Sequence, residues 1–256
     1  MIRVSSAVAS HPGLRREENE DSYCVRPDLG LYIVADGMGG HAAGEVASRL
    51  AIDAIEAFIA DTKATDVQRT WPFPYDPTLS LDGNRLKAAL RLANRRIGHA
   101  VDRDASLKGM ATTAASLLVG PEGITVAHVG DSRVYRSRHG AIEQVTDDHS
   151  WVSEQVKAGS LSEADAKVHP WRNVVTRALA GGEDPEVDVA RVQADQGDVL
   201  MICSDGLSGV VSNDACQSII SSSPSLDDAC RRLIDAANEA GGPDNITVAL
   251  LKIDVD

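Results

Sequence analysis

The sequence predicts an α+β protein in which antiparallel sheets are covered by helices. One reason is that three long helical patterns stand apart from runs of short strand candidates. A second reason is that the stretches VGPEGITV and HVGDSRVY place only a turn between two strand-like segments. Such short connections indicate antiparallel pairing and argue against a repeating βαβ wind, so we expect layered sheets with helices outside them.

The helices are predicted at residues 42–60, 85–103 and 226–240, where apolar residues recur at helical spacing. The first pattern consists of Val46, Leu50, Ala54 and Phe58, and the second of Leu86, Leu90, Ala93, Ile97 and Val101. The third pattern ends before Gly241, Gly242 and Pro243, which is the expected chemistry of a helix stop.

Strands are predicted at short segments that are rich in β-branched or apolar residues. These segments are 22–25, 31–35, 112–120, 124–130, 132–137, 198–204 and 246–253. No internal repeat is visible, and we expect one domain over residues 1–256.

Two segments read as additions to this framework. Residues 70–84 hold three prolines and three aromatic residues, and they form either a loop pinned by its rings or a surface that docks a partner. Residues 151–180 read as two short helices, with Ser162 as an N-cap and a break at His169 and Pro170.

Composition and charge exclude several classes of protein. The net charge of −13 repels nucleic acid and anionic membranes, so neither is expected as a partner. No apolar run reaches about 18 residues, and the N-terminus turns polar before a signal-peptide core forms, so we expect a cytoplasmic protein without a membrane span. Cys203 and Cys230 lie in apolar patterns and are expected to be buried thiols.

Acidic residues recur at the ends of the predicted strands, often beside glycine. They are Glu20, Asp21, Asp36, Asp131, Asp205 and Asp244. Any one of them alone is most often a turn former or a helix cap. Strand ends within one sheet lie along a common edge, which would bring these acids together. Together they require a cation, because like charges raise one another's pKa. Oxygen ligands without His or Cys suit Mg²⁺ or Mn²⁺.

Such a site would have a defined chemistry. Two ions about 4 Å apart bridge one water molecule, lower its pKa and direct it at phosphorus. The helix predicted after Gly40 points its amide end towards this region, which favours anions. Arg15 and Arg16 are candidate phosphate anchors because a guanidinium matches phosphate oxygens bidentately, although either residue also fits a solvated surface charge.

Seven motifs follow one another along the chain: RREENEDS, ADGMGGHAAGE, GMATTAASL, VAHVGDSRVY, TDDHSWV, CSDGLS and GGPDNITV. Their order and spacing over about residues 5–253 resemble the metal-dependent serine/threonine protein phosphatases, the type 2C or PPM family, in its bacterial form. Each motif alone is weakly specific, but the ordered set is strongly specific. The resemblance implies a four-layer α-β-β-α sandwich of two antiparallel sheets flanked by helices, with the metal site at one end.

The resemblance also implies roles for individual residues. Asp36 would bridge two Mn²⁺ or Mg²⁺ ions. The carbonyl of Gly37 and the carboxylate of Glu20 would serve the first ion, directly or through water. Asp205 and Asp244 would serve the second ion.

Further roles follow from the same match. Asp131, with Asp205, would hold a weaker third ion, and Arg16 would bind the substrate phosphate. Residues 151–180 would form a flap subdomain beside the active site that contributes to substrate choice. One departure concerns Met38, because eukaryotic members often carry a histidine there as the proposed general acid. A metal-bound water is then the leading candidate for that acid.

The histidines receive no ligand role. His41 need not face the phosphate, and His149 fits a structural hydrogen bond at least as well as a catalytic function. The remaining histidines have no visible ligand geometry; they are His11, His99, His128, His139 and His169.

The implied activity is hydrolysis of phosphoserine and phosphothreonine in proteins, without a covalent phosphoenzyme. The implied setting is signal transduction opposite a eukaryotic-like Ser/Thr kinase, and we expect a monomer. One alternative is a pseudophosphatase that acts as a binding scaffold, against which the complete set of carboxylates speaks. Another is a metal-dependent phosphoesterase of nucleic acid or metabolites, but the acidic surface disfavours the polymer and the flap fits a protein substrate better.

Overall fold

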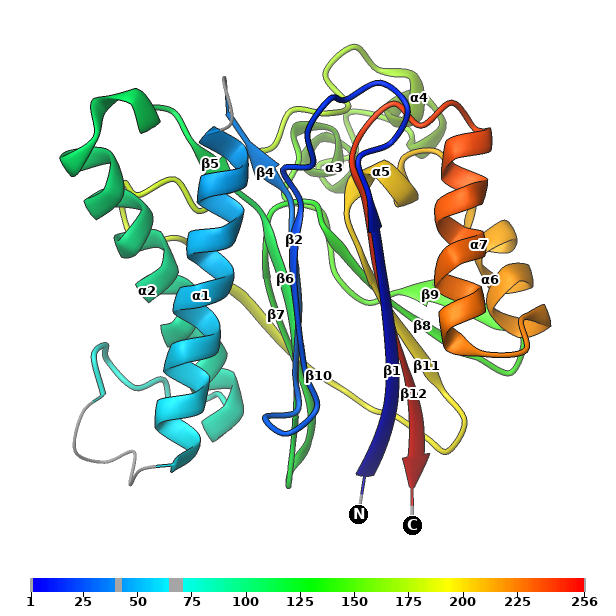
Figure 1. Cartoon of the computed structure of the whole chain (residues 1–256), viewed down its shortest axis with the longest axis horizontal. Helices are drawn as coiled ribbons and strands as arrows, with labels where there is room; N and C mark the ends of the chain where they lie inside the picture. Colours follow the sequence, from blue (N-terminus) through cyan, green and yellow to red (C-terminus); the bar gives the residue numbers. More distant parts are fainter. Residues whose placement is uncertain (1, 40–42, 65–70, 256) are drawn as a thin grey trace.

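Two five-stranded antiparallel sheets stack face to face in the computed structural model, which describes residues 2–39, 43–64 and 71–255 (Figure 1). The first sheet has the order β1 (Ile2–His11), β12 (Ile246–Val255), β11 (Val199–Cys203), β8 (Arg133–Arg138) and β9 (Ala141–Gln144). The second has the order β10 (Asp188–Val192), β7 (Gly123–Val129), β6 (Ala114–Gly120), β3 (Leu31–Ala35) and β2 (Ser22–Arg26). A separate two-stranded ribbon pairs β4 (Gly37–Met38) with β5 (Ala111–Thr112).

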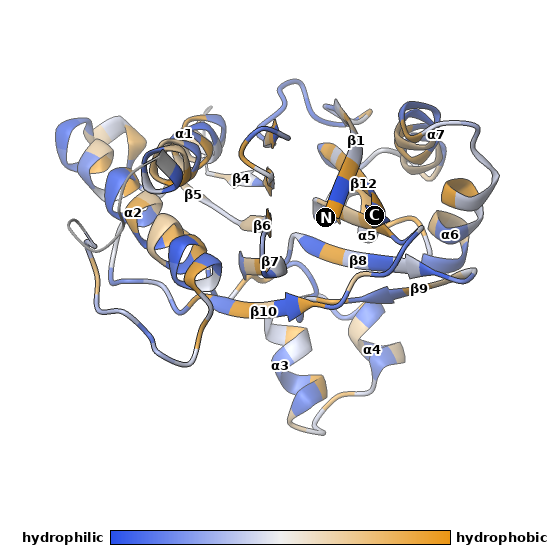
Figure 2. Cartoon of the chain, turned by 90° about the horizontal axis from the view of Figure 1, so that it is seen from below, coloured by the Kyte–Doolittle hydropathy of each residue, from blue (hydrophilic) through white to orange (hydrophobic). Residues whose placement is uncertain are grey.

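Helices cover both outer faces of the sandwich (Figures 1 and 2). The second sheet is covered by α1 (Ala43–Ala64) and α2 (Leu81–Arg103), and the first by α6 (Asn213–Ser222) and α7 (Leu226–Glu239). The shorter helices are η2 (Ala105–Leu107), α3 (Trp151–Lys157), α4 (Glu163–Val168) and α5 (Asp205–Ser208). Serine N-caps begin α2 and α7, since Ser80 and Ser225 each accept a backbone N–H from the first turn.

Strand alternation produces three apolar layers between these four structural layers. In β3, Leu31 and Ile33 pack against α1 and α2, whereas Tyr32 and Val34 pack against the other sheet. The strands of the first sheet alternate in the same way, with one face on α7 and the other on the second sheet. The predicted four-layer α-β-β-α sandwich is therefore confirmed.

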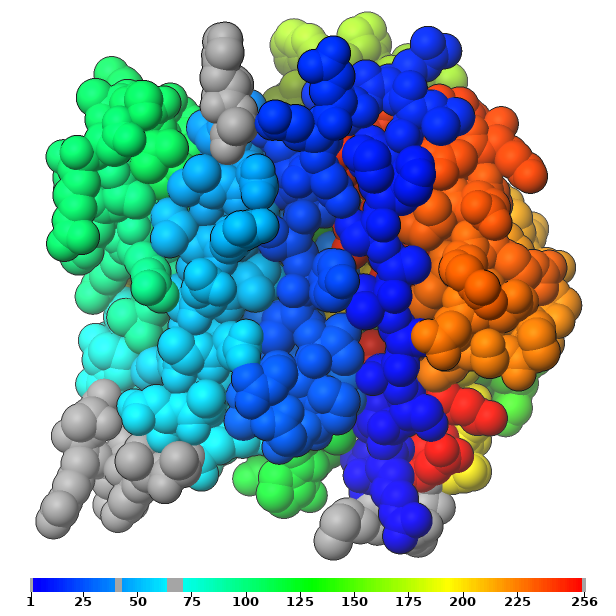
Figure 3. All heavy atoms as spheres, viewed as in Figure 1, coloured from blue at the N-terminus to red at the C-terminus, as the bar shows by residue number. Residues whose placement is uncertain are grey.

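The first strand is one element that the sequence analysis did not predict. No strand was predicted over residues 2–11, yet β1 pairs with β12 along its whole length, from Ile2 opposite Val255 to His11 opposite Ile246. Much of β1 is half-exposed, which explains its weak apolar pattern. In the space-filling view, this strand lies on the surface between the halves that carry α1 and α7 (Figure 3). The strands β9 and β10 and the helix α6 were also not predicted.

The connection from β7 to β8 corrects a second expectation. The stretch HVGDSRVY was predicted to be a turn between paired strands, but β7 belongs to the second sheet and β8 to the first. Gly130 makes the crossing possible with a φ of 106°. The chain therefore changes sheets at the turn that carries Asp131.

The two inserted segments are both ordered, the first through contacts of its aromatic rings and the second as two short helices. Trp71 lies edge-on to Phe58 and Tyr75, with ring centroids 5.9 and 6.0 Å apart, and Arg95 lies 4.2 Å from the centroid of Phe73. These contacts favour a loop pinned onto α1 and α2. The other segment forms α3 and α4, and Ser162 caps α4 as predicted. None of the described helices combines the length and the apolar character needed to cross a bilayer.

Candidate active site

Acidic side chains from both sheets meet at one end of the sandwich, which is uppermost in Figure 1. Asp36 directly follows β3, and Asp131 lies on the crossing turn between β7 and β8. Asp205 begins α5 just after β11, and Asp244 lies just before β12. Asp36 lies in the electrostatic field of all three of the others and of Asp21. The sequence analysis expected the edge of one sheet, whereas the structure gathers the acids from both.

Hydrogen bonds lock the backbone of Asp36. Its N–H donates to Thr113 Oγ1 at 3.0 Å, and its carbonyl accepts from the Thr113 N–H and the Thr112 hydroxyl, each at 2.9 Å. Thr113 Oγ1 also lies 2.7 Å from Ser132 Oγ, next to Asp131. One threonine therefore ties the loop that carries Asp36 to the crossing turn.

Two glycines make room around Glu20. A Cβ on Gly37 would lie 2.5 Å from the Glu20 carbonyl oxygen and 2.2 Å from that of Gly44. A Cβ on Gly44 would lie 2.6 Å from the carboxylate carbon of Glu20, and that carboxylate accepts the backbone N–H of Gly44 in the first turn of α1. The amino-terminal end of α1 thus faces an anion, as expected from the sequence.

Arg16 reaches over the acidic cluster. Its Nη2 donates to Asp244 Oδ2 at 2.8 Å, and the charges of Glu20 and Asp36 act on it too. The pair is open to solvent, since 54% of the Arg16 side chain and 35% of the Asp244 side chain are exposed. Exposed ion pairs contribute little to stability, so this guanidinium is free to exchange its partner for an anionic ligand.

Asp21 and Asn245 belong to the site but were not assigned a role from the sequence. Asp21 is buried, its Oδ2 accepts from the Ser204 hydroxyl at 2.8 Å, and its Oδ1 has no hydrogen-bond partner among the described residues. Asn245 Oδ1 accepts the Glu20 N–H at 2.8 Å, while its amide donates to the Glu18 carbonyl. The feature that could have indicated them in the sequence is that Asp21 directly follows Glu20 and Asn245 directly follows Asp244.

Crowding of the carboxylates shifts their titration. Burial, followed by the charges of Asp21 and Asp205, raises the pKa of Asp36 well above its usual range. Burial also raises the pKa of Asp131 and of Asp21 to about 7, and it raises the pKa of Asp205. The pKa of Glu20 is raised as well, mainly by burial. Ionised together, these groups repel one another.

The cluster fits a divalent cation by the chemistry of its donors. It offers carboxylate and carbonyl oxygens, and Asp21 Oδ1 is a buried acceptor that lacks a protein donor. A hard cation such as Mn²⁺ or Mg²⁺ would offset the charge repulsion and take oxygen ligands. The residues present therefore suit the ions that the sequence predicted.

The metal-free protein is expected to lose stability as the pH rises. Asp21 and Asp131 hold their protons to a higher pH in the folded than in the unfolded protein, so their stabilising contribution is complete below about pH 4 and is lost as the pH passes about 7. Thermal unfolding should show a larger Tm gain from Mn²⁺ at pH 7.5 than at pH 5.5, by several degrees. An equal gain at both pH values would contradict this coupling.

A two-sheet sandwich that gathers carboxylates at one end is the arrangement that the resemblance to metal-dependent phosphatases implies. Residues 15–250 match the family model described as protein phosphatase 2C. Protein phosphatase PhpP of Streptococcus pneumoniae is 35% identical over 246 residues, which cover 94% of each chain. The chain belongs to the protein phosphatase 2C family, which confirms the family recognised in the sequence.

Solved structures agree with this assignment. The serine/threonine phosphatase PstP/Ppp of Mycobacterium tuberculosis has a TM-score of 0.85 and 35% identity, with 100% of both chains covered. The catalytic domain of PstP in complex with two manganese ions has a TM-score of 0.82 and 34% identity, again with 100% of both chains covered. Both are serine/threonine phosphatases, as the sequence analysis predicted for this chain.

Proposed function

We propose that this chain hydrolyses phosphoserine and phosphothreonine in proteins, with two Mn²⁺ or Mg²⁺ ions bound at the acidic cluster. The observation that carries this proposal is the meeting of carboxylates from both sheets beside an exposed arginine. The relatives support it, since PhpP and PstP are named protein phosphatases and one PstP structure contains two manganese ions. The complete carboxylate set makes a pseudophosphatase the weaker alternative.

The proposed ligand roles are those that the family resemblance implies for the acids of the cluster. Asp36 would bridge the two ions, with the Gly37 carbonyl and Glu20 on the side of the first. Asp205 and Asp244 would serve the second. When bound, such ions neutralise the carboxylates and lower the pKa of a water molecule for attack on phosphorus.

Asp131 is proposed to serve a weaker third ion together with Asp205. It is buried on the crossing turn, and the charge of Asp205 acts on it directly. Asp21 is buried within the electrostatic field of Asp205 and Asp244, and its unpartnered Oδ1 would accept a hydrogen bond from a ligand of the ions. Each of these acids lies next to the end of a strand, and these strand ends lie at the same end of the sandwich.

The side chains around the cluster limit the mechanism. Arg16 would bind the substrate phosphate through its planar fork, after releasing Asp244. Met38 has no proton to donate, so the leaving alkoxide would take its proton from water. Among the four cysteines, all buried, burial raises the thiol pKa of Cys216 to about 11 and of Cys24 to about 12, which disfavours a thiolate nucleophile.

We also propose that residues 1–256 act as one catalytic domain with residues 151–180 as its flap subdomain. The flap leaves and returns at neighbouring points, because Ser150 pairs with Val175, and its returning end is also bridged to β5 through Leu179 and Thr112. In Figure 1, α3 and α4 lie near the end of the sandwich that carries the acids, which supports this proposal. A phosphoprotein bound there would contact both the flap and the cluster.

The biological setting is the family's, and we propose it for this chain. Its substrates would be phosphoproteins made by a eukaryotic-like Ser/Thr kinase, in a signal-transduction pair in the cytoplasm. The chain would act there as a monomer. Neither nucleic acid nor a membrane is proposed as a partner, in keeping with the net charge of −13.

A phosphopeptide panel tests the activity. With Mn²⁺, peptides that carry phosphothreonine or phosphoserine should be hydrolysed, and phosphotyrosine peptides of the same sequence should react much more slowly. The variant Arg16→Ala, assayed on this panel, should raise KM about 10- to 100-fold, since charged hydrogen bonds contribute about 1.5–3 kcal/mol.

The matched control is Arg15→Ala, which removes the neighbouring exposed charge and should change KM far less. A change confined to kcat in Arg16→Ala would argue against its role as the phosphate anchor. No hydrolysis of any phosphopeptide by the wild type would overturn the proposed function.

A further inference from the structure

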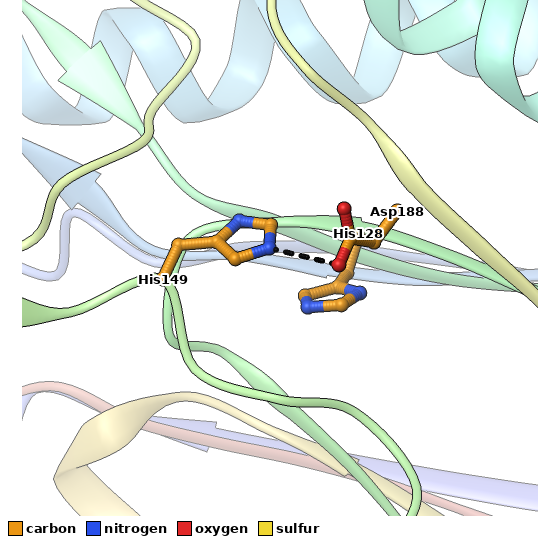
Figure 4. A group of neighbouring side chains, drawn as sticks. All are labelled: His128, His149 and Asp188. Atoms are coloured by element: carbon orange, nitrogen blue, oxygen red, sulfur yellow. Dashed lines mark ion pairs between the residues drawn. The ribbon is translucent and has the colours of Figure 1, made fainter. Parts of the chain in front are cut away.

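A second group of titratable side chains lies outside the acidic cluster. It consists of His128 near the end of β7, His149 just before α3, and Asp188 at the start of β10 (Figure 4). The two imidazoles stack with centroids 4.6 Å apart and planes 22° apart. His149 Nε2 lies 3.3 Å from Asp188 Oδ2, and 5% of the His149 side chain is exposed. The strand register also places Asp188 opposite His128.

Two histidines and an aspartate this close suggest a metal site, but the ring geometry opposes it. A metal lies about 2.0–2.1 Å from an imidazole nitrogen and in the plane of its ring. Stacked, nearly parallel rings have no such point in common. A metal-binding imidazole also donates its other N–H, whereas His149 Nδ1 accepts the Gly130 N–H at 3.1 Å.

The hydrogen bonds assign the hydrogens of His149 instead. Since Nδ1 is an acceptor, the hydrogen of the neutral ring is on Nε2 and points to Asp188. Arg177 Nη1 lies 3.3 Å from the same nitrogen and 3.2 Å from Asp188 Oδ1. Two N–H groups do not bond to each other, so Asp188 is the group that holds both. The ring of His149 is therefore fixed from two sides.

His149 is bonded twice to the residue before Asp131. Its backbone N–H donates to the Gly130 carbonyl at 3.0 Å, and its Nδ1 accepts the Gly130 N–H. Gly130 is constrained further, because a Cβ there would lie 2.6 Å from the Thr113 side chain. The crossing turn thus rests on His149 on one side and on Thr113 on the other.

His149 also lies at the base of the flap. Its carbonyl accepts the Thr176 N–H at 2.8 Å, and the Trp151 N–H donates to the Val174 carbonyl at 2.9 Å. The outgoing and returning ends of the flap are therefore joined at His149. A movement of the flap base would be transmitted to Gly130 through one buried side chain.

We propose that His149 is a positioning residue that couples the flap to the turn carrying Asp131, with Asp188 orienting its ring. The proposal rests on the proposed function in one respect, that Asp131 serves a divalent cation and the flap meets the phosphoprotein. His149 itself touches neither the carboxylates of the cluster nor the substrate in this scheme. Its role is to hold the base of the flap and the crossing turn in a fixed position relative to each other.

Two variants separate the links that His149 makes. His149→Asn places an amide oxygen where Nδ1 accepts from Gly130 and loses the contact with Asp188. His149→Phe keeps a ring to stack on His128 and has no acceptor. In metal-free protein, hydrogen exchange of the Gly130 amide should accelerate at least about 10-fold in His149→Phe and stay near wild type in His149→Asn. His99→Phe, on the exposed face of α2, is the matched control.

Kinetics supply the second readout. His149→Phe should raise the Mn²⁺ concentration for half-maximal activity and the KM for a phosphopeptide by about 10-fold, with a smaller change in KM for p-nitrophenyl phosphate. His149→Asn should restore the Mn²⁺ dependence towards wild type. If His149→Phe does not fold, Asp188→Asn, which weakens the orientation of the ring, should shift the same values in the same direction.

The outcomes separate the two proposals. Unchanged exchange at Gly130 in His149→Phe, or unchanged Mn²⁺ dependence and phosphopeptide KM, would overturn the coupling. A wild-type protein without phosphatase activity would overturn the proposed function, while the exchange data would still decide whether His149 holds the turn. If calorimetry showed that the wild type binds Zn²⁺ and that His149→Asn does not, His149 would be a metal ligand. That result would overturn the positioning role.

Discussion

Asp36→Asn is expected to lower kcat for a phosphothreonine peptide by several orders of magnitude while leaving the fold intact. The substitution removes the charge at the centre of the carboxylate cluster, where a bridging ligand is proposed. The shape of the side chain is kept, and the backbone bonds to Thr112 and Thr113 do not depend on the carboxylate. Steady-state kinetics at saturating Mn²⁺ measure the effect.

Two controls make this result specific. Asp53→Asn makes the same chemical change on an exposed position of α1 and should retain wild-type kcat. The metal-free Asp36→Asn protein should unfold at or above the wild-type temperature, because it lacks a buried acid whose ionisation is opposed by burial and by the neighbouring charges. Near-normal turnover would refute the metal assignment, and a lower Tm would attribute the lost activity to damaged folding.

The elements that the sequence predicted are those with strong, one-sided or fully buried apolar patterns. In β3, all five residues from Leu31 to Ala35 are buried, so its pattern is continuous. The face of α2 towards the sheet repeats at helical spacing, and only its start was misplaced, since the structure begins the helix at Leu81 after the Ser80 cap. Local signals were sufficient for these elements.

Two of the strands that were missed, β1 and β10, depend on partners distant in the chain. The strand β1 is half-exposed and owes its conformation to pairing with β12 at the other terminus. Likewise, β10 alternates poorly and is ordered by its register on β7. The crossing from β7 to β8 was misread because a glycine-containing turn looks alike within a sheet and between sheets.

Some residues of the candidate site were likewise identified from the sequence, and others were not. Strand-end acids such as Asp36 and Asp205 were identified because a charge after a buried run is conspicuous. Asp21, Thr113 and Asn245 were not assigned, because their functions consist of hydrogen bonds across the fold. His41, which was weighed beside Met38, lies outside the described residues. A sequence pattern shows which acidic residues stand in unusual positions, but it does not show which residues form hydrogen bonds around them.

Removal of divalent cations is expected to reduce hydrolysis of the phosphothreonine peptide to background, and Mn²⁺ or Mg²⁺ should restore it. The pKa values of Asp21 and Asp131 are raised to about 7. At neutral pH, repulsion among the acids of the site therefore opposes their full ionisation. A cation both offsets that repulsion and supplies the activated water that no side chain here provides. Initial rates in excess EDTA, followed by a titration with each metal, measure this dependence.

The same titration distinguishes a metal bound to the protein from one that only binds the substrate. A cation that binds the folded state alone stabilises it by about 2.7 kcal/mol at 100 times its Kd, which corresponds to a Tm gain of about 5–10 °C for a domain of this size. Restored activity without a Tm gain would place the metal on the phosphopeptide instead of the protein. Full activity in excess chelator would contradict metal-assisted hydrolysis altogether, because Arg16 alone would then remain to polarise the phosphate.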